Sequence, residues 1–238
     1  MATRTPLQPS AEGLKTIGLL QGLPLAALEE LARHCTWKRT HPRQVVISRD
    51  APDHDVYMIV AGHVQVTAYS AEGRQLTYRE MYAGECFGEF AAIDGRARTA
   101  DVIAMDDSLL AVMKQADFRE LLHSHTLVND RILLRLTGTV RDLTERLFEL
   151  STLPVQDRVR AEVLRLAHKA GISDNSACLD PAPSHAEMAS NISTIREEVS
   201  RELSAMAKKG LVRRVGKALQ ILDVQRLEKI VFEVRRSG

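Results

Sequence analysis

The stretch Phe87–Ala100 reads FGEFAAIDGRARTA and guides the interpretation of the whole chain. Gly88-Glu89 and Arg98-Thr99 lie ten residues apart, with small residues between them. Glycine lets a ligand approach the backbone, an arginine offers a planar fork to phosphate oxygens, and a carboxylate accepts hydrogen bonds from ribose hydroxyls. These are the groups that a cyclic nucleotide needs in one pocket. The alternative is a plain surface ion pair between Glu89 and Arg98.

Short runs rich in β-branched and aromatic residues surround this stretch. They are VVISRD (45–50), VYMIVAGHVQVTAYS (56–70), RQLTYREMYAGE (74–85), ADVIAMDD (100–107) and SLLAVM (108–113), with turn glycines in AGH, AEGR and YAGE. Several short strands at this spacing predict a compact antiparallel barrel or sandwich. Before them, Leu14–Cys35 carries apolar residues at helical spacing, and Pro24 is expected to open its second helix.

The helical period returns beyond about Asp117 and then tightens to a heptad. The residues at alternating steps of four and three are Asn129, Leu133, Leu136, Val140, Leu143, Leu147 and Leu150. Such a seam is typical of a coiled coil and predicts a homodimer formed through the helix 129–150. The alternative is one long helix whose stripe packs on its own β domain. Leu153-Pro154 should end the helix, because proline disfavours helix at the residue before it.

The segment beyond Pro154 is typical of a winged helix-turn-helix. An amphipathic helix over 156–169 and a loop over 171–183 precede two S/T-x-x-E capping boxes, Ser184 with Glu187 and Thr194 with Glu197. Two helix starts only ten residues apart predict a helix-turn-helix. LVRRVGKALQIL (211–222) then predicts two wing strands joined at 215–217. The expected fold class is α+β, with a β-roll domain at 14–125, a dimerisation helix at 126–153 and a winged helix-turn-helix at 154–238.

The composition is unlike that of a disordered, fibrous or membrane-spanning protein. Hydrophobic residues make up 45% of the 238 residues and charged residues 26%, as in ordinary globular proteins. The net charge of +1 divides into 17 basic and 20 acidic residues (−3) over 1–150, and 15 and 11 (+4) over 151–238, which weakly indicates a polyanion partner for the C-terminal part. No apolar run suits a membrane span, and MATRTPLQPS lacks the apolar core of a signal, so a cytoplasmic protein is expected.

The chain resembles a known family both in its motifs and in the order of its segments. Phe87–Ala100 resembles the phosphate-binding cassette of cyclic-nucleotide-binding domains. The succession of β-roll, cassette, seam helix and winged helix-turn-helix resembles the CRP/FNR family of bacterial transcription regulators, over about Leu14–Ile230. The resemblance implies an allosteric, non-enzymatic regulator that binds a cyclic nucleotide. It also implies double-stranded DNA with a pseudo-palindromic operator and RNA polymerase as partners.

By this resemblance, Gly88 and Glu89 hold the ribose and phosphate edge, and Arg98 and Thr99 hold the cyclic phosphate. Leu143 and Thr144 stand where the family's founding cAMP-binding member has a Thr-Ser pair that reads the purine. Leu143 offers no hydrogen bond to a base, which leaves the identity of the base open, and a hydroxyl directly after the cassette arginine, here Thr99, also occurs in cGMP-responsive domains. We therefore expect cAMP first and cGMP second, with a degenerate pocket or another effector as alternatives. The implied effector residues are Phe87, Gly88, Glu89, Phe90, Ala91, Arg98, Thr99, Ala100, Leu143 and Thr144.

Other cofactors of the family fit less well. An iron–sulfur cluster needs an N-terminal set of cysteines, and Cys35 alone cannot provide one; Cys86 and Cys178 are far away, and all three thiols are expected to be at least half-buried. His63 as a haem ligand is less favoured than His63 as a solvent-facing turn residue. His123 and His125 have no carboxylate or cysteine cluster beside them. We therefore expect no metal, no iron–sulfur cluster and no haem.

STIREEVSREL (193–203) is the expected recognition helix. By resemblance, Arg196, Glu197 and Arg201 read DNA bases, and chemically arginine suits guanine O6 and N7 while glutamate accepts from the cytosine amino group. The alternatives are a solvated helix on which Glu197 pairs with Arg201, and a nucleotide-gated interaction module that does not bind DNA. The expected DNA-contacting residues are Ser184, His185, Thr194, Arg196, Glu197, Arg201 and Lys217.

Overall fold

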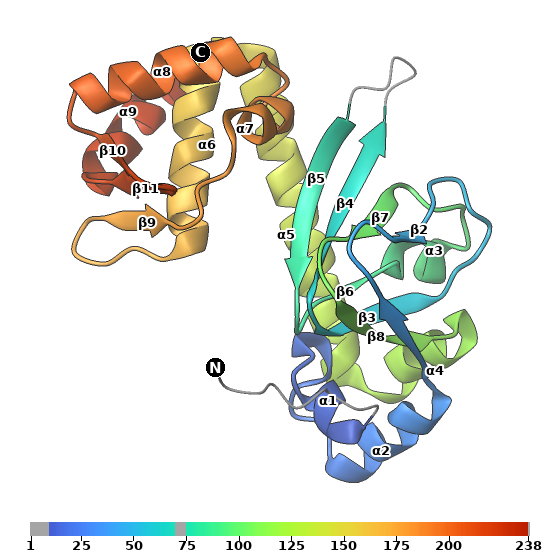
Figure 1. The fold of residues 1–238 in the computed structure, drawn as a ribbon. Coiled ribbons are helices and arrows are strands. Elements are labelled where there is room, and N and C mark those ends of the chain that lie inside the picture. The colour runs from blue at the N-terminus through green and yellow to red at the C-terminus, as the bar shows by residue number, and fades with distance from the viewer. Residues whose placement is uncertain (1–9, 70–74, 238) are drawn as a thin grey trace. The chain divides into compact units, whose positions relative to one another are not determined.

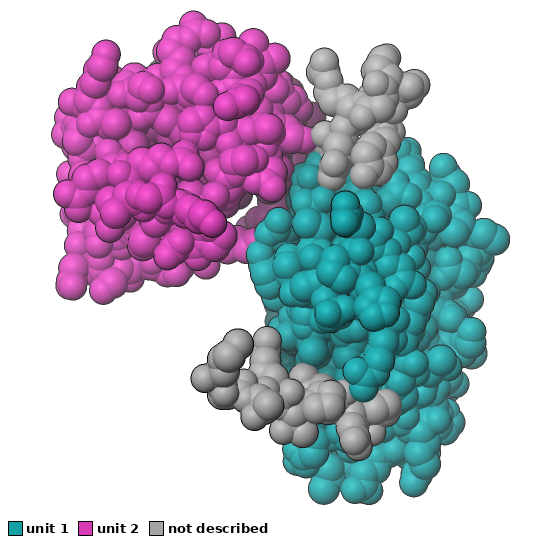
Figure 2. All heavy atoms as spheres, in the orientation of Figure 1, with its two compact units in different colours: residues 1–138 teal, residues 139–238 magenta. Residues whose placement is uncertain are grey.

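The computed structural model describes residues 10–69 and 75–237 (Figure 1). The chain divides into two compact units, residues 1–138 and residues 139–238 (Figure 2). The expectations for the first nine residues and for the AEGR turn lie outside the described residues. Every helix in the described part of the chain is too short or too polar to cross a membrane.

Two four-stranded antiparallel sheets build unit 1, with strand orders β1-β8-β3-β6 and β2-β7-β4-β5. The strands are β1 (Thr36–Thr40), β2 (Val45–Ile47), β3 (Val56–Ala61), β4 (His63–Tyr69), β5 (Gln75–Tyr82), β6 (Cys86–Phe87), β7 (Asp101–Ala104) and β8 (Ser108–Met113). The antiparallel sandwich is confirmed. The sequence pattern missed β1, whose residues TWKRT are largely polar and which lies at the sheet edge beside β8.

The sheet β1-β8-β3-β6 is the middle layer of unit 1, and β3 shows why. Successive side chains of a strand point to opposite faces. Val56, Met58 and Val60 pack with the helices, whereas Tyr57 and Ile59 pack toward the second sheet. A strand buried on both faces reads as the continuous apolar run that the sequence displays.

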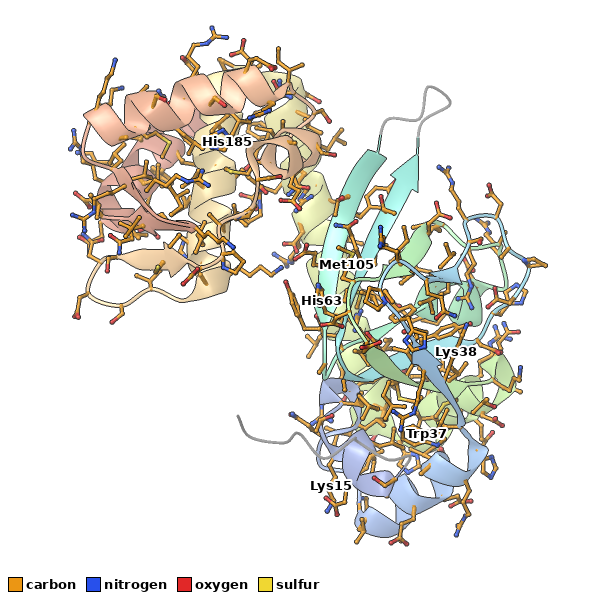
Figure 3. All side chains as sticks on the ribbon, in the orientation of Figure 1. Lys15, Trp37, Lys38, His63, Met105 and His185 are labelled. Carbon is orange, nitrogen blue, oxygen red and sulfur yellow. The ribbon has the colours of Figure 1, made fainter. Side chains whose placement is uncertain are left out.

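The helices of unit 1 are α1 (Ala11–Lys15), the 3₁₀ turn η1 (Gly18–Leu20), α2 (Leu25–His34), α3 (Glu89–Asp94), α4 (Gln115–Ser124) and the start of α5 (Thr126–Thr152). Pro24 directly precedes α2 as its N-cap, as expected. Trp37 of β1, labelled in Figure 3, donates from Nε1 to the carbonyl of Ala32, 3.3 Å away. Val128 and Ile132 are the buried residues that pack the start of α5 into this core.

The heptad stripe of α5 is a different set of side chains. Its leucines and valine are between 41% and 65% exposed at positions 133, 140, 143, 147 and 150, and Leu136 is half-buried. Within unit 1, Leu133 is 53% exposed and so does not pack into the β domain, as the alternative would require. The expected break is confirmed, because α5 ends at Thr152 and Pro154 is the N-cap of the next helix.

Unit 2 continues with α6 (Val155–Ala170), β9 (Ala177–Leu179), α7 (His185–Asn191), α8 (Arg196–Lys208), β10 (Val212–Val215), β11 (Ala218–Ile221) and α9 (Val224–Ser237). Its helices enclose one apolar core over a small sheet of order β10-β11-β9. The two wing strands are confirmed, with Gly216 in the left-handed region at their turn (φ +59°). The expected loop 171–183 is partly wrong, since it contains β9.

One of the two capping boxes is confirmed. Ser184 Oγ accepts from the Glu187 amide at 3.2 Å, and Glu187 Oε2 accepts from the Ser184 amide at 2.6 Å. The box at Thr194 is wrong, because α8 begins later, with Ile195 as its N-cap and no side-chain cap. The Thr194 amide instead donates to the carbonyl of Ala189, at 2.9 Å, and so belongs to the turn.

A buried cluster of charges stabilises unit 2 where the end of α5 meets α6 and α9. Glu149 of α5 accepts from Arg165 of α6 at 2.7 Å and from Arg235 of α9 at 2.5 Å. Arg165 also pairs with Glu162, which in turn accepts from Asn191 of α7 at 3.0 Å. The Glu149 carboxylate is the most buried group of the three that meet there, at 4% exposure against 30% for each arginine.

Candidate functional site

Gly88 sits in a place where no other residue fits. Its φ is +88°, and a β-carbon there would lie 2.6 Å from Arg98 Nη1 and 2.8 Å from the carbonyl oxygen of Asp55. Both distances are far below ordinary contact, so the strand β6 must turn into α3 through a glycine. This glycine lets the Arg98 guanidinium lie directly against the backbone.

Arg98 is almost completely buried and held on several sides. Its Nη1 donates to the carbonyl of Gly88 at 3.0 Å, and its Nη2 donates to the carbonyl of Asp55 at 2.7 Å and to the carboxylate of Asp53. The guanidinium carbon lies 5.8 Å from the ring centroid of Tyr57. Arg98 Nε is buried without a hydrogen-bond partner among the described residues. The Nε–H of Arg98 is thus still available to an acceptor supplied by a ligand.

The tip of Arg98 carries one ion pair, with Asp53. Partial burial acts to raise the pKa of the Asp53 carboxyl, but the hydrogen bond and charge of Arg98 outweigh it and hold that pKa below its ordinary value. Asp55, two residues on, pairs with Lys114 at 2.8 Å instead. Backbone hydrogen bonds between Arg98 and residues 50 and 51 fix this acidic loop beside the cassette.

Glu89, the first residue of α3, is also buried, and its partner is Arg135 of α5, with Nε and Oε1 3.5 Å apart. Arg135 Nη1 also lies 3.1 Å from the sulfur of Cys86. The expected alternative of a surface pair between Glu89 and Arg98 is wrong, because both are buried and each has a different partner. Burial raises the pKa of the Cys86 thiol to about 12, so it stays protonated.

The other expected effector residues fall into two groups. In unit 1, Phe87 is buried and stacks on Tyr57 with ring centroids 5.1 Å apart; Ala91 and Ala100 are buried, while Phe90 and Thr99 are exposed. In unit 2, Leu143 and Thr144 are exposed on α5, and Thr144 Oγ1 donates to the carbonyl of Val140 at 2.8 Å. The structure thus brings Phe87, Gly88 and Arg98 together, and base reading by Leu143 and Thr144 stays a prediction.

His63 and Cys178 differ from their expected settings. His63 (labelled in Figure 3) is the first residue of β4 and is half-buried; its Nδ1 lies 2.9 Å from Asp106 Oδ2 and its ring stacks on Tyr82. The solvent-facing interpretation is therefore wrong, and these contacts explain the histidine structurally. Cys35 and Cys86 are buried as expected, but Cys178 is exposed.

Helix α8 presents the expected base-reading side chains on its exposed side. Val199, Leu203 and Met206 face the core, whereas Arg196, Glu197 and Arg201 are exposed. Arg201 pairs with Glu198, at i,i+3, rather than with Glu197. Of the other expected DNA contacts, Ser184 caps α7, Lys217 is exposed at the wing turn and Thr194 is half-buried.

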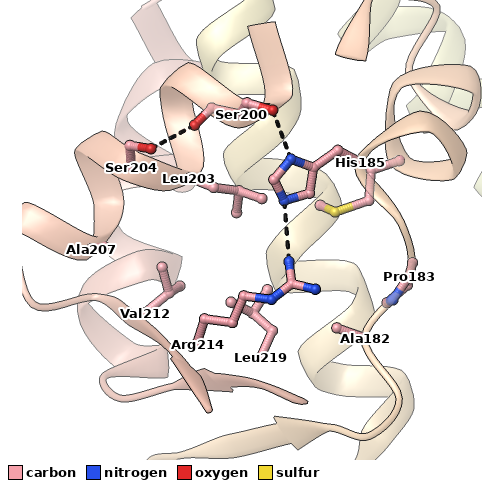
Figure 4. Close-up of a pocket in the computed structure, with 11 residues that line it drawn as sticks. Ala182, Pro183, His185, Ser200, Leu203, Ser204, Ala207, Val212, Arg214 and Leu219 are labelled. Carbon is pink, nitrogen blue, oxygen red and sulfur yellow. Dashed lines mark hydrogen bonds between the residues drawn. The ribbon is translucent and has the colours of Figure 1, made fainter. Parts of the chain in front are cut away.

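His185 lines a cavity of about 170 Å³ between α8 and the wing (Figure 4). Its Nδ1 lies 2.7 Å from Ser200 Oγ and its Nε2 lies 3.5 Å from Arg214 Nη1. The Arg214 guanidinium can only donate, so Nε2 must be the accepting nitrogen and the proton belongs on Nδ1. Burial, and then the charges of Arg214 and Arg196, lower the pKa of His185 and favour this neutral ring.

Sequence reasoning missed Asp53 and Arg135 as neighbours of the cassette, and Ser200 beside His185. Asp53 is 45 residues from Arg98, and Arg135 is 46 residues from Glu89. No local period relates residues so far apart. The one signal in the sequence was Arg135 itself, a charged residue beside the apolar stripe of the helix and therefore a candidate partner for a carboxylate.

Comparison with known proteins agrees with both halves of this description. Residues 37–125 match the family described as cyclic nucleotide-binding domain, and residues 157–230 match the Crp-like helix-turn-helix domain. A CRP-like cAMP-activated global transcriptional regulator of Mycobacterium tuberculosis is 25% identical over 222 residues, which are 92% of this chain and 98% of the relative. The cyclic AMP receptor protein of Thermus thermophilus is 28% identical over 179 residues, 74% of this chain and 79% of the relative.

Among solved structures, the c-di-GMP responsive global regulator CLP of Xanthomonas campestris superposes with a TM-score of 0.66 at 23% identity, over 84% of this chain and 99% of that protein. At this identity the likeness concerns the fold. The two matched domains together span more than half of the chain, with the cyclic nucleotide-binding domain first and the helix-turn-helix domain second. The chain, with its cyclic nucleotide-binding domain and its DNA-binding domain, therefore belongs to the CRP/FNR family of transcription regulators, which are not enzymes.

Proposed function

We propose that this protein is a cytoplasmic, homodimeric transcription regulator whose effector is a cyclic nucleotide, cAMP first and cGMP second. The observation that carries the proposal is Arg98, buried against Gly88 with an Nε–H that lacks a partner among the described residues. A phosphodiester anion suits such a guanidinium, because charge-assisted hydrogen bonds to phosphate are strong and planar arginine presents them in pairs. Two relatives, one named a cAMP-activated regulator and the other a cyclic AMP receptor protein, support cAMP as the first choice.

Under this proposal Glu89 links the effector to α5. Cys86 lies two residues before Gly88 and Glu89 directly after it, and both contact Arg135. A ribose hydroxyl that hydrogen-bonds Glu89 would compete with Arg135 for the same carboxylate. The nucleotide would then favour one arrangement of α5 over another, and a ligand can shift a conformational equilibrium only through such differential contacts. We place the hinge that transmits this shift near Leu153-Pro154, between the functional parts 126–153 and 154–238. The ion pairs of Glu149 with Arg165 and Arg235 span this joint, so the hinge can turn only if these pairs rearrange with it.

The exposed heptad stripe of α5 supports the homodimer. Leu136→Glu together with Val140→Glu would bury four like charges across a two-fold axis and should yield a monomer in light scattering. Leu134→Glu is the control, because Leu134 lies on the same helix, is 72% exposed and falls outside the stripe. A double variant that remains dimeric would rule out this seam as the interface.

DNA recognition is assigned to the exposed side of α8. We propose that Arg196, Glu197 and Arg201 read bases, and that Ser184, His185, Thr194 and Lys217 contact the sugar-phosphate backbone. A symmetric dimer places its recognition helices in successive major grooves about 34 Å apart, so the operator should be a pseudo-palindrome. RNA polymerase is the further partner that we propose on this operator.

The test of the effector is calorimetric titration with cAMP, cGMP and cyclic di-GMP. Wild type should bind one of the first two, and Arg98→Ala should abolish that binding by removing charge-assisted contacts worth about 1.5–3 kcal/mol each. Arg96→Ala is the matched control, since Arg96 lies in the same segment and is exposed. Gel shifts with a pseudo-palindromic library, with and without nucleotide, then test coupling to DNA.

A different effector is the second candidate, and Leu143 favours it, because its side chain cannot hydrogen-bond a purine. Binding of cyclic di-GMP alone would select that candidate. Equal affinity of wild type and Arg98→Ala for every nucleotide would remove the cassette assignment altogether.

A further inference from the structure

The phosphate-binding arginine of this chain already has an anionic partner within the protein. Asp53 Oδ2 accepts a hydrogen bond from Arg98 Nη2, and Asp53 is the charged group bonded to Arg98 in the described part of the chain. The other contacts of the guanidinium are neutral backbone carbonyls, at Gly88 and Asp55. The Asp53 carboxylate thus supplies the single negative charge that Arg98 requires when buried.

The two members of this pair differ in how easily each can leave. The Arg98 side chain is 3% exposed and fixed by backbone, whereas the Asp53 side chain is 43% exposed. A carboxylate and a phosphodiester both carry one negative charge and both bind guanidinium through oxygen pairs. Asp53 can therefore move into solvent at low cost while another anion takes its place on Arg98.

The loop that carries Asp53 keeps the carboxylate near the cassette. The Asp50 amide donates to the carbonyl of Arg98 at 3.0 Å, and the Arg98 amide donates to the carbonyl of Ala51 at 3.2 Å. A tethered group has a high effective concentration at the site it can reach. The carboxylate thus competes with a free anion continuously.

We infer that Asp53 is an intramolecular competitor of the effector phosphate, and that effector binding exchanges one anion for the other on Arg98. The inference rests on the proposed function and adds the residue that sets the affinity. Asp53 weakens binding in proportion to the strength of its own pair with Arg98. The cassette then responds only to effector concentrations high enough to displace the carboxylate.

The test replaces the charge and keeps the shape. Asp53→Asn retains an amide oxygen that can accept from Arg98 Nη2, so the guanidinium stays in place while the competing charge is lost. Asp55→Asn is the matched control, because it removes the same charge from the same loop, but the Asp55 carboxylate pairs with Lys114. Calorimetric titration with cAMP and cGMP at two salt concentrations gives the affinities, and melting followed by the fluorescence of Trp37 verifies the fold.

We expect Asp53→Asn to bind the effector roughly fivefold more tightly than wild type, the equivalent of about 1 kcal/mol, because partly exposed ion pairs contribute up to that amount. Asp55→Asn should change affinity by less than about twofold, and Asp53→Glu should not gain affinity. The gain of Asp53→Asn should shrink at high salt, since salt screens an exposed carboxylate.

Three results would overturn the inference. If wild type binds nucleotide and Asp53→Asn binds equally well or more weakly, Asp53 is only structural and the proposed function stands. If Asp53→Asn and Asp55→Asn gain equally, the effect is the general field of the acidic loop. If neither wild type nor Asp53→Asn binds any cyclic nucleotide, the proposed function fails and the exchange fails with it.

Discussion

Two arginine–carboxylate sites in this protein are built in opposite ways. In the cassette the arginine is the buried member, with Arg98 3% and Asp53 43% exposed. In the cluster at the end of α5 the carboxylate is the buried member, with Glu149 4% and its two arginines each 30% exposed. An anionic ligand can replace an exposed carboxylate on a buried arginine. A buried carboxylate with arginines around it offers no such exchange, and so we interpret Glu149 as structural.

The largest effect expected from this difference is on Glu149. Glu149→Ala leaves Arg165 and Arg235 without their shared partner and should lower the free energy of unfolding of unit 2 by about 3 kcal/mol, the lower end for breaking a buried pair. The control is Glu145→Ala, because Glu145 also pairs with Arg235 but is 49% exposed, and it should cost less than about 1 kcal/mol.

The measurement separates the two units. Trp37 is the single tryptophan and lies in unit 1, so its fluorescence follows unit 1, whereas far-ultraviolet circular dichroism follows the helices of both units. In urea, Glu149→Ala should shift the dichroism transition and leave the tryptophan transition in place. An equal loss of unfolding free energy in Glu149→Ala and Glu145→Ala would show that the burial of Glu149 does not make it structurally important.

A smaller effect on stability is expected for the cassette arginine. Arg98→Ala leaves Asp53 free to hydrate, so the cost is the loss of two hydrogen bonds to backbone carbonyls, about 1–2 kcal/mol. The Trp37 transition should report this loss, with the fold of unit 1 retained. A cost above that of Glu149→Ala would mean that Arg98 is chiefly structural, contrary to the comparison.

Local periodicity explains which parts of the fold were predictable. Strand β3 reads as a continuous apolar run because both of its faces are buried, and the stripe of α5 follows a heptad. Strand β1 was missed because its residues are mostly polar and its stability comes from pairing with β8. The capping box at Thr194 was misread because the same residue types also suit a turn, and the Thr194 amide bonds to Ala189.

The partners of the cassette residues were beyond sequence reasoning for a related physical reason. The types and spacing of Gly88, Glu89 and Arg98 predicted an anion pocket, and the left-handed glycine against the guanidinium agrees with that prediction. Which carboxylate meets Arg98 depends on the path of the loop around residue 53, which the sheets determine. Several carboxylates in unit 1 were equally eligible from sequence.

The third arginine–carboxylate pair in this comparison, Arg201 with Glu198 on the recognition helix, is exposed and is expected to contribute the least to stability. Arg201 is 70% exposed and its partner Glu198 32% exposed, so Glu198→Ala should alter stability by less than about 0.5 kcal/mol. The variant frees Arg201 and removes a negative charge near DNA, and should raise operator affinity roughly fivefold at low salt. Lys208→Ala is a control for charge on the same helix, with the opposite sign. Gel-shift titration at several salt concentrations measures both, and an unchanged affinity for Glu198→Ala would show that Arg201 does not approach the DNA.

His185 is the case in which an arginine faces no carboxylate, and the expected effect is the smallest. Arg214 Nη1 lies 3.5 Å from His185 Nε2. Protonation of Nε2 would remove the acceptor for this Arg214 N–H and would place a positive ring beside the charges of Arg214 and Arg196. The pKa of His185 is therefore lower in the folded protein than its ordinary value near 6.5. Because the unfolded chain takes up the proton first, this neutral histidine contributes stability that is fully present above pH 6.5 and is lost as the pH falls toward the folded-state pKa.

The test variant is His185→Asn, which keeps a donor toward Ser200 and cannot titrate. The other histidines titrate alike in wild type and variant, so their contributions cancel in the difference between the two unfolding free energies. That difference should be constant above about pH 7 and should turn against wild type as the solution is acidified. A difference that stays flat to pH 5, or that favours wild type in acid, would show that Arg214 and His185 do not meet in solution as they do here.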